Sequence, residues 1–110
     1  MNNVMVINGV KAVIDFDPEI EMFRGEFVGL NGGADFYAKD VDGLKREGEA
    51  SLRVFLEMCA QDGVEPYKTF SGKMMFRVAP EVHEAATIAA QAAGLSLNQW
   101  AESALRSAAN

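Results

Sequence analysis

Three residues near the C-terminal end of the chain are spaced so that their side chains would share one side of an extended strand. Lys73, Met75 and Arg77 are separated by one apolar residue each. Successive side chains of a strand point to opposite faces, so the apolar set would face a core and these three would face outward. Ammonium and guanidinium groups donate hydrogen bonds to phosphates and base edges, and a thioether can touch a thymine methyl. On an isolated edge strand, two such charges would more commonly be solvated.

Two short helices are predicted after this strand. Pro80 suits a first helical turn, where its missing N–H would have no partner, and Gly94 suits the left-handed position after a helix. Between them, small apolar residues recur at helical spacing and predict a helix over about residues 81–93. Ser96 is a good N-cap for a second helix with Trp100 in its first turn. The order strand, helix, helix is that of a ribbon-helix-helix module.

The predicted module is too small to form a core by itself. About forty residues with so many alanines bury too little apolar surface to offset the ordering of the chain. We therefore expect a second copy to complete it, in an intertwined homodimer whose two strands pair as an antiparallel ribbon.

A two-stranded ribbon fits the major groove of DNA, and the outward side chains would then contact base edges. The backbone N–H groups at the start of the second helix would bind a flanking phosphate, because a helix N-terminus carries partial positive charge. The predicted base contacts are Lys73, Met75 and Arg77, and the predicted phosphate contacts are Ser96, Leu97 and Asn98.

Charge divides the 110 residues into two parts. Residues 1–70 contain thirteen acidic and seven basic side chains, a net charge of −6, whereas residues 71–110 contain three of each. A chain that only bound nucleic acid would more commonly be basic. The acidic part is therefore expected to face something other than DNA, either a basic protein partner or only solvent. We place the domain boundary near Phe70, within a linker over residues 65–72.

The first seventy residues predict an α+β domain in which one helix packs on an antiparallel sheet of three to four strands. Asp40 is a good N-cap for the helix, Gly63 ends it, and Gly48 in its middle would allow close contact with the sheet. The expected strands are residues 10–17, 22–30 and 34–38, with a fourth short strand at 67–70 joining the edge.

The carboxylates of the first hairpin are the candidates for a catalytic function. Acidic side chains on adjacent strands can hold divalent cations for phosphodiester cleavage, which would make the chain a metal-dependent nuclease. The pattern places no other acidic group to complete a cage, so solvated carboxylates are the simpler interpretation. The hairpin carboxylates are Asp15, Asp17, Glu19, Glu21 and Glu26.

The remaining reactive residue types indicate no enzyme and no cofactor. His83 is the only histidine and has no patterned nucleophile or second ligand near it. Cys59 is the only cysteine, which excludes an internal disulfide, and its place in a helical apolar pattern indicates a small core residue. We expect no metal, no membrane partner and a cytoplasmic location.

Five runs of the sequence together carry a resemblance to a known family: residues 14–18, 23–26, 52–59, 71–73 and 97–100. In these runs the chain resembles the HicB family of antitoxins from bacterial type II toxin–antitoxin pairs. The resemblance implies an N-terminal domain like a degraded ribonuclease H fold, without a working active site, that binds and blocks a small basic HicA ribonuclease. It also implies a C-terminal domain that represses the promoter of the pair. Met75 departs from the family, where this position is often polar.

The leading hypothesis is a two-part antitoxin. Residues 1–70 would bind and inhibit a HicA-type ribonuclease toxin, and residues 71–110 would form a homodimer, or a higher homo-oligomer, that binds double-stranded operator DNA. The first alternative is a standalone ribbon-helix-helix transcriptional regulator, whose N-terminal domain only oligomerises or senses a ligand. The second is the metal-dependent nuclease.

Overall fold

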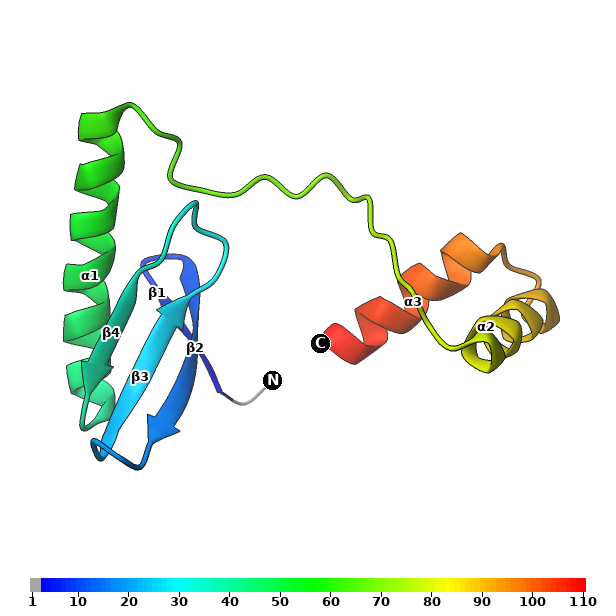
Figure 1. Ribbon diagram of the computed structural model, residues 1–110, viewed down its shortest axis with the longest axis horizontal. Coiled ribbons are helices and arrows are strands. Elements are labelled where there is room, and N and C mark those ends of the chain that lie inside the picture. The colour runs from blue at the N-terminus through cyan, green and yellow to red at the C-terminus, as the bar shows by residue number, and fades with distance from the viewer. Residues whose placement is uncertain (1–2) are drawn as a thin grey trace. The chain divides into compact units, whose positions relative to one another are not determined.

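The computed structural model describes residues 3–110, which divide into two compact units that meet between Ser71 and Gly72. Residues 3–71 are the N-terminal unit and residues 72–110 the C-terminal unit. The molecule is α+β, with one antiparallel sheet and three helices among the described residues (Figure 1).

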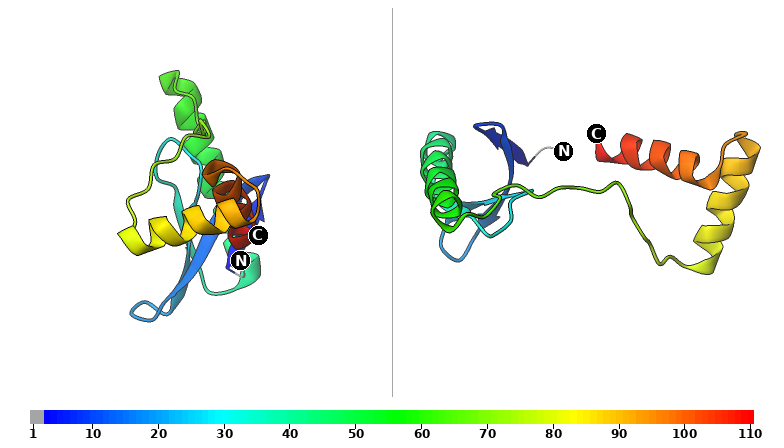
Figure 2. Two further views of the ribbon diagram at one scale, coloured as in Figure 1. Left: turned by 90° about the vertical axis from the view of Figure 1, so that its right-hand side faces the viewer. Right: turned by 90° about the horizontal axis from the view of Figure 1, so that it is seen from above.

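The N-terminal unit is a four-stranded antiparallel sheet with strand order β1-β2-β3-β4, and α1 lies across one of its faces (Figures 1 and 2). The α+β class, the antiparallel sheet and its single packed helix are therefore confirmed. The elements are β1 (Val4–Ile7), β2 (Val10–Asp17), β3 (Met22–Phe27), β4 (Asp35–Ala38) and α1 (Val41–Asp62).

The fourth strand is not the one expected from the sequence. β1 takes that place, and residues 67–70 make only an isolated bridge between Tyr67 and Leu30. Asn8 and Gly9, with φ of 50° and 82°, form a two-residue turn from β1 to β2, which suits the right-handed twist of paired strands. β3 ends at Phe27 rather than at residue 30, because Gly29 takes a φ of 88° and turns the chain away.

The core of the N-terminal unit lies between the sheet and α1. Alternate positions of β2 and β3 face the helix, and Ala12 pairs with Phe27 across these strands. A Cβ atom on Gly48 would overlap the side chain of Ile7 and lie unusually close to that of Phe36, so glycine lets the helix approach the sheet closely, as expected. The buried cluster is Ile7, Val10, Ala12, Phe27, Leu30, Ala34, Phe36, Ala38, Leu44 and Leu52.

Residues at both ends of α1 fix its length. Asp40 accepts a hydrogen bond from the backbone N–H of Gly43 at 2.6 Å. Gly63 adopts the left-handed conformation with φ 66°, and the Val64 N–H donates to the carbonyl of Cys59 at 2.9 Å. The two residues expected to bound the helix therefore do so.

The first half of the expected linker is bound to the N-terminal unit. The side-chain amide of Asn31 donates to the carbonyl of Glu65 at 2.7 Å and to that of Tyr67 at 3.1 Å. The Lys68 N–H donates to the carbonyl of Gly29 at 2.9 Å. Residues 65–68 are thus part of this unit, and only the residues after them connect the two units.

The C-terminal unit consists of residues 72–79, here called the tail segment, followed by α2 (Pro80–Ala92) and α3 (Leu97–Ala109). Both helices were expected. The tail segment contains the expected strand 73–78, but among the described residues this stretch is not part of a sheet. Among the described residues of this unit, Ala90 alone is buried in a helix.

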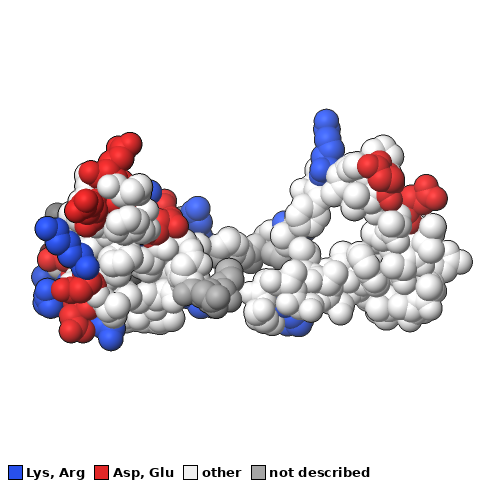
Figure 3. Space-filling model, turned by 90° about the horizontal axis from the view of Figure 1, so that it is seen from below, with Lys and Arg blue, Asp and Glu red and all other residues white. Residues whose placement is uncertain are grey.

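Charged side chains are concentrated on the N-terminal unit in the face drawn in Figure 3. The C-terminal unit shows mostly uncharged atoms there, consistent with its three acidic and three basic residues. No helix among residues 3–110 is both long enough and apolar enough to cross a bilayer.

Candidate nucleic-acid interface

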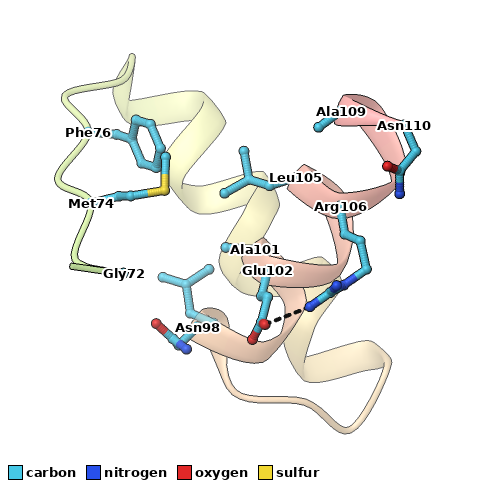
Figure 4. A pocket seen from close by; sticks show the side chains of 11 residues that line it. Gly72, Met74, Phe76, Asn98, Ala101, Glu102, Leu105, Arg106, Ala109 and Asn110 are labelled. Atoms are coloured by element: carbon cyan, nitrogen blue, oxygen red, sulfur yellow. Dashed lines mark hydrogen bonds and ion pairs between the residues drawn. The ribbon is translucent and has the colours of Figure 1, made fainter. Parts of the chain in front are cut away.

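The tail segment alternates in the way that the sequence predicts. Met74 and Phe76 point into a hollow whose far wall is α3, with Ala101 and Leu105 among its lining residues (Figure 4). Met75, between them, does not line this hollow and is 98% exposed. The apolar side of the segment therefore faces the helix pair, while the intervening side chain points to solvent.

The three predicted base-contact residues are all exposed on the tail segment. Lys73, Met75 and Arg77 alternate along one short exposed stretch of the chain. The cationic residues Lys73 and Arg77 each lie two positions from Met75. The base contacts of all three residues stay a prediction.

The N-terminus of α3 is closed by a capping box. The Ser96 hydroxyl accepts a hydrogen bond from the Gln99 N–H at 3.1 Å, and the Gln99 side chain accepts one from the Ser96 N–H at 2.9 Å. The N–H groups of Leu97 and Asn98 have no acceptor within the described part of the chain, as expected for a first helical turn. Of the three predicted phosphate donors, Ser96 is already satisfied and the other two are available.

The sequence pattern contained a sign of this box that the prediction did not use. Ser96 is followed three residues later by Gln99, which is the spacing of reciprocal N-terminal capping. From that spacing, Ser96 could have been predicted to cap the helix, and only the N–H groups of Leu97 and Asn98 to bind a phosphate.

A tight turn orients α3 relative to α2. Gly94 has a φ of 71°, and its N–H donates to the carbonyl of Gln91 at 3.1 Å. The Leu95 N–H reaches back to the carbonyl of Ala90 at 2.9 Å, which completes a Schellman ending for α2. Both helix ends at this corner are satisfied locally, so the start of α3 is held in a defined direction.

The C-terminal unit exposes most of its large apolar side chains. Met74 is 68% exposed and Phe76 is 60% exposed, although both face the hollow beside α3. An apolar surface of this extent on a small unit is typical of an interface. The other exposed large apolar residues of the unit are Met75, Val78, Val82, Ile88, Leu95, Leu97 and Leu105.

A cluster of charged side chains lies on the sheet face of the N-terminal unit opposite α1. Arg24 contacts Asp35 through Nη2 at 2.5 Å and through Nε at 3.2 Å, and lies 3.6 Å from Glu26. The hydrogen bond and the charge of Asp35 raise the pKa of the Arg24 guanidinium above its ordinary value. This exposed network neutralises part of the acidic surface and has no catalytic geometry.

The residue types that were weighed for chemistry do not gather into a site. Within residues 3–110, no three His, Cys, Asp or Glu side chains are close enough together to hold a metal ion. Cys59 is buried in α1, as expected for a small core residue. His83 lies in the first turns of α2, where its carbonyl accepts a hydrogen bond from the Thr87 hydroxyl at 2.9 Å.

Comparison with known proteins gives one match. The model of the HicB family matches residues 55–105, from within α1 to within α3, so the match includes the whole tail segment and α2. No curated protein and no solved structure matches the chain.

Proposed function

We propose that this chain, which matches the HicB family over residues 55–105, is an antitoxin of a toxin–antitoxin system and acts through two surfaces. The C-terminal unit forms a ribbon-helix-helix homodimer that binds operator DNA and represses its own operon. The N-terminal unit binds a HicA-type ribonuclease toxin and inhibits it. The antitoxin role follows from the family, whereas the two surfaces and their ligands are the proposal.

The observation that carries the DNA-binding half is the incomplete core of the C-terminal unit. Met74 and Phe76 face α3 and still remain more than half exposed. A second copy whose tail segment pairs with the first would cover these apolar side chains. Pairing also places two sets of outward residues side by side, in a ribbon wide enough for a major groove.

The DNA contacts divide between the ribbon and α3. Lys73 and Arg77 supply cationic donors to base edges, and Met75 supplies an apolar contact. The N–H groups of Leu97 and Asn98 bind a backbone phosphate at the start of α3. Ser96 holds that helix start in place through its capping box.

Charge supports the toxin-binding half. The first seventy residues carry a net charge of −6, and their acidic side chains lie on a unit that is separate from the DNA-binding residues. A small basic ribonuclease would be attracted to such a surface and held away from its RNA substrate. Because the acidic residues and the DNA-binding residues belong to different units, one chain could bind both a cationic protein and anionic DNA.

A salt-dependent operator titration tests the ribbon assignment. Lys73→Ala/Arg77→Ala should weaken operator binding by about 1–3 kcal/mol for each side chain that reads a base, and should lower the salt slope for each charge that neutralises a phosphate. Lys11→Ala/Lys45→Ala removes the same charge from the N-terminal unit and should leave both quantities unchanged. Equal affinity and slope in the first variant and the native chain would show that the tail segment does not contact DNA.

A standalone transcriptional regulator is the second candidate, because the family match covers residues 72–105 of the C-terminal unit but only residues 55–71 of the N-terminal unit. Purification of the tagged chain from its native host separates the two candidates. A small basic protein that co-purifies in equal amount supports the antitoxin, whereas a chain purified without such a partner supports the regulator.

A further inference from the structure

The two edges of the N-terminal sheet differ in how they are protected against further pairing. Along β4, the helix α1 lies close to the edge, and the Ser51 hydroxyl donates to the carbonyl of Asp35 at 3.1 Å. β1 has the sequence Val-Met-Val-Ile, without a charge, a proline or a bulge. Charges and proline are the usual means of closing an edge strand, so β1 is the edge open to a new partner.

The hydrogen-bonding groups that β1 offers can be assigned from its pairing with β2. The Ile14 N–H donates to the carbonyl of Asn3 at 2.8 Å, which makes these two residues a hydrogen-bonded pair. Such pairs alternate along an antiparallel ladder, so Met5 bonds to β2 while Val4 and Val6 direct their N–H and C=O groups to the open side. Val6 is also 61% exposed at its side chain.

An apolar hollow adjoins the same strand. Its lining includes Met5 together with Phe16, from β2, and Val41, from the first turn of α1. Phe16 and Val41 are 56% and 58% exposed. The uncovered apolar surface therefore continues from the open edge of β1 onto the helix side of the sheet.

We propose that β1 pairs antiparallel with β1 of a second copy, with Met5 opposite Met5 at the centre of the register. Val4 then lies opposite Val6 of the second copy, and the groups that point to the open side form both hydrogen bonds of that pair. The two sheets join into one, and the apolar hollows on their helix sides become neighbours.

A second copy fits this edge better than a basic protein does. β1 has no charged side chain, so the proposed register places no two charges opposite each other. It also places Val4 of each copy opposite Val6 of the other. A cationic partner would instead be attracted to the acidic side chains elsewhere on the unit. Pairing of two four-residue strands would bury far less surface than the roughly 1,000 Å² of a stable interface. The β1 pairing therefore rests on the proposed C-terminal dimer, which would hold the two β1 strands at an effective concentration of about millimolar relative to each other.

Disulfide trapping in the full-length chain tests the register. In a Cys59→Ala background, Met5→Cys places two thiols at a non-hydrogen-bonded pair with about 4.5 Å between Cα atoms, within disulfide range. Val6→Cys is the matched control, since its two copies would be roughly 8 Å apart. Under mild oxidation, Met5→Cys should give covalent dimer at least about ten times faster than Val6→Cys, by the geometric limit on disulfide formation. Equal rates, or no covalent dimer from Met5→Cys, overturn the proposal.

A second variant separates this pairing from the C-terminal dimer. Val6→Pro removes an N–H that points to the open side and leaves the bonds between β1 and β2 intact. Added to Met5→Cys, it should abolish the covalent dimer, whereas trapping that persists contradicts β1 pairing. Light scattering of Val6→Pro alone should still give the mass of a dimer. A monomer mass would instead refute the C-terminal dimer, while the trapping result continues to decide the β1 edge.

Discussion

Replacing Phe76 by alanine should dissociate the homodimer that we propose for the C-terminal unit. The Phe76 ring points toward α3 but is 60% exposed in the single chain (Figure 4). If a second tail segment covers this side of the unit, the exposed part of the ring leaves water on dimer formation. The truncation removes that gain without removing a hydrogen-bonding group.

The size of the effect follows from the exposed area. A phenylalanine buries about 200 Å² when fully covered, so the exposed fraction corresponds to roughly 120 Å². At about 25 cal/mol per Å², its burial is worth roughly 3 kcal/mol, of which alanine would retain about a third. Two copies lose about 4 kcal/mol together, which raises the dimer dissociation constant about a thousand-fold.

Sedimentation equilibrium of the full-length variants measures this constant directly. Met75→Ala is the matched control, because Met75 is adjacent, 98% exposed and outside the hollow. It should leave the dissociation constant unchanged and alter only operator binding. A Phe76→Ala constant within three-fold of the native value would refute the reasoning, as would an equal loss of affinity in both variants.

Three further substitutions test the local structure. Gly48→Val should destabilise the N-terminal unit by about 1–3 kcal/mol in urea unfolding, because any Cβ there overlaps Ile7 and lies unusually close to Phe36; unchanged stability would contradict this close approach. Ser96→Ala should cost about 1 kcal/mol of unfolding free energy because it removes the cap, and a variant as stable as the native chain would show that the capping box contributes nothing. Asn31→Ala should speed proteolysis within residues 65–71, since its amide holds Glu65 and Tyr67; an unchanged cleavage rate would contradict that anchoring role.

The helices could be predicted because their signals are local. Asp40 and Gly63 bound α1, Pro80 and Gly94 bound α2, and Ser96 begins α3. Each of these residues acts on backbone groups within a few positions of itself, so a single sequence is sufficient. The HicB resemblance was confirmed in the same region, which the family match spans from residue 55.

The strands were harder to predict because pairing joins distant residues. β1 was missed although Asn8-Gly9, a strong hairpin signal, follows its apolar run directly. Residues 67–70 have the residue types of a strand, but the Asn31 side chain binds the carbonyl of Tyr67, and only the isolated bridge between Tyr67 and Leu30 forms. The strand expected in the tail segment would form only on pairing with the second copy that we propose, so this strand and the DNA contacts of Lys73, Met75 and Arg77 stay predictions.

Inhibition of RNA cleavage is the most direct test of the antitoxin proposal. The rate of RNA cleavage by a purified HicA-type ribonuclease toxin would be measured while the full-length chain is added. We predict that cleavage ends at one chain for each toxin molecule, because the acidic N-terminal unit occupies the toxin. Cleavage that continues at the same rate with a ten-fold excess of the folded chain would contradict the account.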